Sequence, residues 1–246
     1  MARTVVVLVV LLVAAPARAQ SPQPWKGENL QYFPKDIARE PLTQRMREFS
    51  FALGVRCQYC HAGGNGITFE GVSFASDEKP AKTTARAMLR MLDQINTVAL
   101  TQLPSRAQPR VVVECATCHR GVSLPKSLQT TLIEIVDAQG TPAAVAKYRE
   151  LRKDEALGRY NFGEWEINEL ARRLTEAGKP EAAIAMLEMN GEFYPASPEI
   201  DVLIGDLQRR LGDRDKAAQR YRAALAKSPQ HPVAKQRIEE LEKTPR

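Results

Sequence analysis

Two short stretches of the chain share one pattern of cysteine and histidine: VRCQYCHAGG at residues 55–64 and VECATCHRGV at residues 113–122. In both, two residues separate a pair of cysteines, and a histidine directly follows the second cysteine. The chain of 246 residues has no cysteine outside these two copies, which hold Cys57, Cys60, Cys115 and Cys118. One chemistry should therefore account for all four thiols.

Three chemistries can use cysteines in such pairs. A disulfide within each pair would close a very small loop and would give no role to His61 or His119. Zinc binds two Cys-x-x-Cys pairs, but 54 residues separate the pairs here, whereas zinc ribbons separate theirs by about 15–20. The third chemistry is covalent attachment of c-type haem, for which Cys-x-x-Cys-His is the signature. Each cysteine forms a thioether to the haem, and the histidine binds the iron. We therefore expect two covalently bound haem c groups, held by Cys57, Cys60 and His61 and by Cys115, Cys118 and His119.

The third and last histidine, His231, lies between two prolines in SPQHPVA and is interpreted as a loop residue. With so few histidines, at most one haem could be bis-histidine, so methionine is the expected axial ligand opposite the histidine. Iron held by histidine and methionine has a raised potential and suits electron transfer.

The segment ahead of the first motif, PLTQRMREFSFALGVRC, predicts an amphipathic helix that ends at Gly54. Its apolar stripe consists of Leu42, Met46, Phe49 and Leu53. From spacing alone, core packing and iron ligation are both open for Met46.

The segment ahead of the second motif, SDEKPAKTTARAMLRMLDQIN, predicts another helix that opens at Ser76 or Asp77 with acidic residues in its first turn. Met88 and Met91 both lie on this helix and cannot face quite the same way. One of them can bind iron while the other packs.

These segments resemble the cytochrome c subunit of photosynthetic reaction centres, and more closely its small dihaem relatives in non-phototrophic bacteria. The resemblance covers about residues 33–125 and rests on FPKDI, LTQRMREFSFALGVRCQYCH, ASDEKPAKTTARAMLRMLDQIN and CATCHRG. It implies helix–turn–Cys-x-x-Cys-His units in which Met46 serves the first haem and Met88 the second, with Met91 in reserve. The full subunit of that family carries four haems, whereas this chain has motifs for two.

The N-terminus has the features of a cleaved secretory signal peptide. Arg3 precedes an apolar stretch over residues 4–15, and Ala17-Arg18-Ala19 has the form of a cleavage site. An uncleaved membrane anchor is the alternative, although the stretch is shorter than the roughly 20 residues of a spanning helix. We expect an exported, periplasmic protein, and nucleic acid is not an expected partner because the basic residues are scattered.

Beyond residue 126 the sequence shows a period of 34 residues, seen in Gly178 and Gly212, Ala183 and Ala217, and Pro195 and Pro229. The period resembles tetratricopeptide helix pairs, and the apolar positions that carry it are Ile167, Leu170, Leu174, Ile204, Gly205, Tyr221 and Ala224. Further helices are expected before and after these units. Tyr160, Phe162 and Trp165 are expected to lie in the core of this half, with contact to a partner as the alternative.

The sequence thus predicts a mostly α-helical chain with a signal peptide at 1–19, a dihaem cytochrome domain at 20–125 and helical repeats at 126–246. The expected function is electron transfer, not enzymatic catalysis, with a redox partner protein docked by the repeats, in a complex that can be membrane-associated. Two alternatives stay open: a haem-bearing redox sensor or scaffold, and a dihaem enzyme of the peroxidase type, which would need an open iron position.

Overall fold

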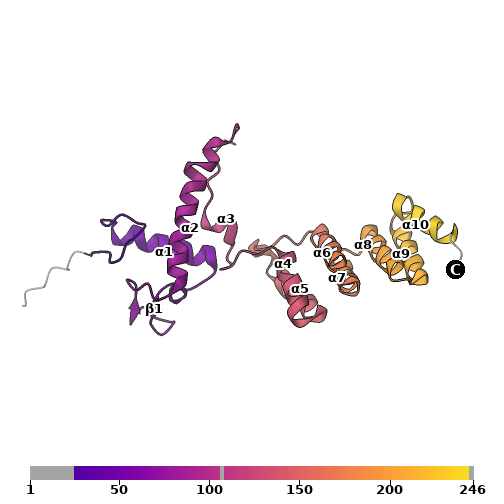
Figure 1. The fold of residues 1–246 in the computed structure, drawn as a ribbon, viewed down its shortest axis with the longest axis horizontal. Helices are drawn as coiled ribbons and strands as arrows, with labels where there is room; N and C mark the ends of the chain where they lie inside the picture. The colour runs from indigo at the N-terminus through magenta and orange to yellow at the C-terminus, as the bar shows by residue number, and fades with distance from the viewer. Residues whose placement is uncertain (1–24, 106–107, 244–246) are drawn as a thin grey trace, which may run out of the picture. The chain divides into compact units, whose positions relative to one another are not determined.

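The computed structural model describes residues 25–105 and 108–243, and the predicted signal peptide lies outside these ranges. The described chain is mostly helical, as predicted (Figure 1). It forms two compact units. The first combines the described residues up to Arg47 with Cys57–Met91, and the second combines Glu48–Arg56 with the described residues from Leu92 onward. Among the described residues, no helix is both long enough and apolar enough to cross a membrane.

Helix α1 spans Arg39–Leu53 and stops where the sequence predicts. Gly54 follows it with a φ of 65°, in the left-handed region that glycine adopts without steric penalty. The end of α1 therefore turns the chain directly into the first cysteine motif.

Helix α2 spans Pro80–Thr97, so the prediction that it opens at Ser76 or Asp77 is wrong. Proline fits the first position of a helix because its fixed φ suits the helix and its missing N–H leaves no donor unpaired. Asp77 instead stands outside the helix, where its carboxylate pairs with Lys82 Nζ at 3.2 Å and Arg86 Nη2 at 2.8 Å.

Short elements connect α1 and α2. A 3₁₀ turn, η1, covers Cys57–Tyr59. Strand β1, Ala62–Gly63, pairs antiparallel with β2, Val72–Ser73. After α2, the chain forms η2 at Ala99–Gln102 and the short helix α3 at Cys115–His119.

The C-terminal half consists of helices joined by short turns. Their bounds are α4 Leu128–Gln139, α5 Thr141–Lys153, α6 Glu164–Glu176, α7 Pro180–Phe193, α8 Pro198–Arg210, α9 Arg214–Lys227 and α10 Pro232–Lys243, with a 3₁₀ turn η3 at Glu155–Leu157. Short connections make sequential helices neighbours, and α4 packs on α5, α6 on α7, and α8 on α9, with α10 against α9 (Figure 1).

The 34-residue period corresponds to repeated structural positions. Gly178 and Gly212 end α6 and α8 with φ values of 75° and 85°, a conformation that favours glycine. Ala183 and Ala217 are fully buried near the start of α7 and α9, where two helices meet. The helix pairs are therefore compatible with the repeats that the sequence predicts.

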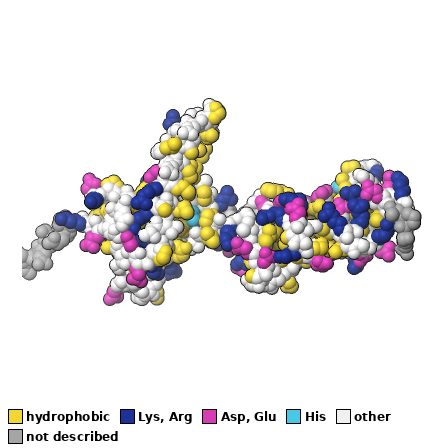
Figure 2. Space-filling model, in the orientation of Figure 1, with side chains coloured by type: hydrophobic (Ala, Val, Ile, Leu, Met, Phe, Trp, Pro, Cys, Tyr) yellow, Lys and Arg dark blue, Asp and Glu magenta, His cyan; other side chains and the backbone are white. Residues whose placement is uncertain are grey.

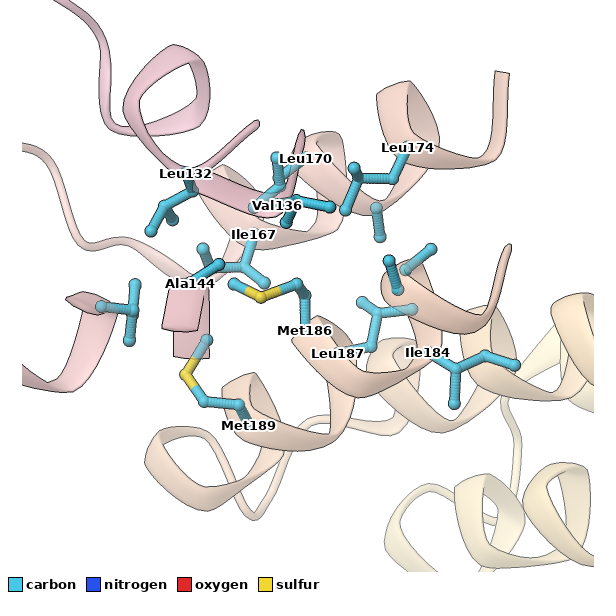
Figure 3. Close-up of a cluster of buried hydrophobic side chains, with 14 of the residues drawn as sticks. Leu132, Val136, Ala144, Ile167, Leu170, Leu174, Ile184, Met186, Leu187 and Met189 are labelled. Carbon is cyan, nitrogen blue, oxygen red and sulfur yellow. The ribbon is translucent and has the colours of Figure 1, made fainter. Parts of the chain in front are cut away.

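One continuous apolar cluster fills the space between α4, α5, α6, α7 and α8 (Figure 3). Of the aromatic residues expected there, Phe162 is buried and Tyr160 packs partly buried against the cluster. Trp165 is 60% exposed, so its predicted place in the core is wrong. It lies two residues before Ile167 on α6, about 200° around the helix from the buried face.

Candidate functional site

The first motif folds as a single tight turn. The backbone N–H groups of Cys60 and His61 both donate to the carbonyl oxygen of Cys57, at 3.2 Å and 2.9 Å. All three residues are partly buried. In the unmodified chain, burial and then the nearby Cys57 raise the pKa of the Cys60 thiol.

His61 has a ring nitrogen that the protein leaves unused. Its Nδ1 is buried and has no hydrogen-bond partner among the described residues. The ring packs edge-on against Phe74, with 5.0 Å between ring centroids. Burial, and then the charge of Lys82, lower the pKa of His61. The imidazole is therefore neutral at physiological pH, which is the form that binds a metal ion.

Basic side chains from α2 and the turn before it surround this motif. Lys79 Nζ donates to the Gln58 carbonyl at 2.5 Å, and Lys82 Nζ donates to the Phe74 carbonyl at 2.8 Å. Arg86 is buried, and Arg86 followed by Asn29 holds the pKa of the Asp77 carboxyl well below its ordinary value.

The Nη1 atom of Arg86 is buried without a hydrogen-bond partner among the described residues. Because an unpaired buried polar atom costs free energy, this donor fits an anionic oxygen of a bound group. A haem carries such oxygens on its propionates. The donor set around the first motif therefore fits haem.

The second motif forms helix α3. Its N-terminus has a reciprocal cap, in which the Glu114 side chain accepts from the Thr117 backbone and the Thr117 hydroxyl accepts from the Glu114 N–H at 3.0 Å. At the other end, Arg120 and Gly121 both adopt positive φ, which stops the helix directly after His119.

The ring of His119 is oriented by a backbone carbonyl. Its Nδ1 lies 2.9 Å from the Val122 oxygen. A carbonyl oxygen can only accept, so Nδ1 carries a proton, and in the neutral form of this ring the lone pair lies on Nε2. Metal-binding histidines typically donate their other N–H in this way, which fixes the tautomer and raises the basicity of the ligand. The second motif therefore also presents a histidine ready to bind iron.

The three predicted methionine ligands all lie in the first compact unit. Met46 lies partly buried on α1, in the same unit as the first motif. Met88 and Met91 are 42% and 43% exposed on α2, in the first unit, whereas His119 belongs to the second. The assignment of each methionine to a haem stays a prediction.

The N-terminal half also lacks an apolar core of its own. Among the described residues up to Pro125, only the apolar side chains of Ala52 and Ala62 are buried. Many large apolar side chains there are exposed, and the face in Figure 2 shows apolar groups along α2. They include Phe51, Tyr59, Ile67, Phe69, Phe74, Val111, Val112 and Leu124. A bound haem would present a large apolar macrocycle to apolar side chains of this kind, and covering them would be favourable.

All four cysteines are free thiols, so no disulfide is present. Among the described residues, no group of three or more His, Cys, Asp or Glu side chains is positioned to hold a metal ion.

Sequence reasoning missed two features of these sites. The carbonyl of Val122 as partner of His119 has no signal in residue type, because any residue supplies a carbonyl. The basic residues around the first motif, Lys79, Lys82 and Arg86, are visible in the sequence, and the spacing of four between Lys82 and Arg86 places those two on one side of α2.

Comparison with known proteins adds an independent observation. Residues 56–156 match the family model described as photosynthetic reaction centre cytochrome C subunit. The match begins after the segment that holds Met46, and it extends through α4 and α5.

Cytochrome c-554 of Chloroflexus aurantiacus is 40% identical over 87 residues, which cover 35% of this chain and 18% of that protein. A crystal structure of PcrH in complex with the chaperone binding region of PopB aligns over 47% of this chain and 89% of that chain, with 16% identity and a TM-score of 0.30, too low to support an argument about fold. Over residues 56–156 the chain is similar to the cytochrome subunit of photosynthetic reaction centres, and the resemblance expected from its two motifs is confirmed.

Proposed function

We propose that the chain is an exported dihaem c-type cytochrome that transfers electrons to or from a partner protein. The observation that carries this proposal is the second motif. There, Cys115 and Cys118 precede His119, whose Nδ1 is hydrogen-bonded to the Val122 carbonyl oxygen. The iron of a bound haem supplies one-electron redox chemistry, and the protein supplies attachment, orientation and electrostatics.

The side chains of the two motifs have separate roles in this proposal. Cys57, Cys60, Cys115 and Cys118 attach the two haems covalently. His61 and His119 would bind the irons: His61 has a lowered pKa and a ring nitrogen without a partner among the described residues, and the ring of His119 is oriented by the Val122 carbonyl. Met46 and Met88 complete the coordination, with Met91 as the alternative to Met88. Histidine–methionine ligation leaves no open iron position, which suits a carrier better than a peroxidase.

We further propose that the tetratricopeptide-like helices dock the redox partner. Stacked helix pairs form extended surfaces for protein recognition. A shallow pocket at the turn between α7 and α8 is lined by Glu164, Phe193, Tyr194, Pro195, Ala196 and Ser197. Glu164 directly precedes the exposed Trp165, and tryptophan is enriched among residues that dominate binding energy. Docking would raise the effective concentration of the partner without altering the irons.

The experiment that tests the redox proposal is a potentiometric titration of the purified, exported protein with optical spectra. Two one-electron steps and an iron–sulfur absorption signature in the ferric spectrum are expected. Carbon monoxide added to the reduced protein should not bind rapidly. Fast binding would contradict the carrier and favour a sensor or an enzyme with an open iron position.

The docking proposal has its own test in the full chain. Trp165→Ala should slow electron exchange with the partner while both haem potentials stay unchanged. Leu211→Ala is the matched control, because Leu211 is also an exposed apolar residue of the repeats, 43% exposed, but neither it nor its sequence neighbours line that pocket, whereas Trp165 directly follows the lining residue Glu164. Equal effects of the two variants would contradict docking at this surface.

A further inference from the structure

The loop that leaves α1 is packed against the turn that follows the second motif. The Gly121 N–H donates to the carbonyl oxygen of Ala52 at 2.8 Å, and Ala52 is one of the few buried residues of the N-terminal half. Both residues belong to the second compact unit, as does Gly54. Segments nearly 70 residues apart in the sequence are thus held together through their backbones.

The approach is so close that only glycine fits at position 54. A Cβ atom built on Gly54 would lie 2.1 Å from the carbonyl oxygen of Gly121 and 2.8 Å from its carbonyl carbon. Both are backbone atoms, which cannot rotate away as the end of a side chain can. Any side chain at this position must therefore push the Gly121 turn outward.

That turn is the one that orients His119. Gly121 lies between His119 and Val122, and the Val122 N–H donates to the His119 carbonyl at 2.9 Å. The Val122 carbonyl in turn accepts from His119 Nδ1 at 2.9 Å. A displacement of Gly121 moves its neighbour Val122, and with it the acceptor that fixes the imidazole.

We propose that Gly54, although it stands three residues ahead of the first motif, is a positioning residue for the histidine of the second haem. This inference rests on the proposed function, because it takes His119 as an iron ligand. Donation from Nδ1 to the carbonyl makes the imidazole a stronger ligand, which stabilises ferric iron more than ferrous iron. Loss of this hydrogen bond should raise the potential of the second haem and leave the first unchanged.

The test uses the full, haem-loaded chain with Gly54→Ala and Gly54→Asn. Asparagine tolerates the left-handed backbone better than alanine, so similar effects of both variants identify the clash as the cause. Gly158→Ala is the matched control, because Gly158 has a φ of 64° and nothing within 4 Å of its added Cβ, whereas Gly54 has a φ of 65°. The Cys57→Ser, Cys60→Ser chain, which can attach only the second haem, identifies that haem's signals.

We expect both Gly54 variants to raise the midpoint potential of the second haem, by about 59 mV if the ferric state loses tenfold in relative stability. Loss of the second haem alone would support the inference equally. A shift or loss at the first haem only, or no difference from Gly158→Ala, would overturn it.

If the Gly54 variants do not fold, the inference is tested on the unsubstituted protein. The inference requires the Gly121 amide proton to exchange slowly with solvent in the reduced protein, as a donor to the buried Ala52 carbonyl. Exchange at the rate of an open chain would overturn it. A wild-type protein without covalent haem would instead refute the proposed function, so the two failures are distinguishable.

Discussion

Gly205 offers a sharp test of how the repeat helices pack. It lies in the middle of α8, and a Cβ added to it would stand 2.5 Å from Cε1 and 2.7 Å from Cδ1 of Tyr221 on α9. Ordinary contacts between such carbon atoms begin at about 3.5 Å. The ring of Tyr221 would therefore have to retreat by about 1 Å in a Gly205→Ala variant.

The Tyr221 ring has little freedom to move away from position 205. Tyr221 is fully buried, and its hydroxyl donates to Asp206 Oδ1 at 2.8 Å. The same carboxylate oxygen accepts from Arg237 Nε of α10 at 2.8 Å. The aromatic ring is thus held at its far end by a charged pair that joins three helices.

Two opposing effects determine how much Gly205→Ala changes the free energy of unfolding. Replacing glycine by alanine inside a helix stabilises it by about 1 kcal/mol, while overpacking a filled core costs about 1–3 kcal/mol. We expect Gly205→Ala to lower the free energy of unfolding by about 1 kcal/mol. The matched control is Gly191→Ala in α7, where the added Cβ would meet only Ile200 Cγ2, at an ordinary 3.8 Å. That variant should raise the free energy of unfolding by about 0.5–1 kcal/mol.

Urea unfolding followed by far-ultraviolet circular dichroism measures both variants against the parent chain. A double-mutant cycle with Tyr221→Phe adds a second readout, because a ring freed from Asp206 can yield more easily. The loss caused by Gly205→Ala should shrink in that background by about 0.5–1 kcal/mol. The packing argument is refuted if Gly205→Ala stabilises the chain as much as Gly191→Ala does.

Three further predictions concern pH, the ligands and the repeats. Burial, and then Asp206, raise the pKa of Tyr221 above 10.0, so the unfolded chain loses this proton at a lower pH than the folded chain does. The free energy of unfolding should therefore fall above about pH 10, by at most about 1.4 kcal/mol per pH unit. Tyr221→Phe should reduce that fall in alkaline urea titrations. Met46→Ala should remove the iron–sulfur absorption of the first haem and lower its potential, and Met88→Ala should do so for the second; the same result from Met91→Ala instead would show that the second assignment is wrong. Residues 126–246, whose described part holds an apolar cluster built without the N-terminal half, should fold alone with a cooperative thermal transition, and an excess of this fragment should slow partner reduction by the full chain. An unchanged reduction rate would count against docking.

Features fixed by local sequence were predicted well. The stripe through Met46 and the glycine that follows predicted helix α1 and its end, because an apolar period and a left-handed residue both act over a few positions. The 34-residue period paired Gly178 with Gly212, and in the structure both follow a helix with positive φ. Local signals also misled: Asp77 resembles a helix start but pairs with α2 from outside it.

Features made by segments distant in sequence were not predictable from one chain. No residue type indicates that the Ala52 carbonyl accepts from the Gly121 N–H, or that the Gly54 backbone packs closely against the Gly121 turn. Trp165 shows the complementary error, since this aromatic residue was assigned to the core without regard to its angular position on α6.

The intact mass of the exported protein tests the central claim most directly. If each motif anchors one haem, the mass should exceed that of the processed polypeptide by two haems. The Cys57→Ser, Cys60→Ser chain and the Cys115→Ser, Cys118→Ser chain should each retain one haem. A wild-type mass that corresponds to the bare polypeptide, to a single haem or to bound zinc would contradict the account.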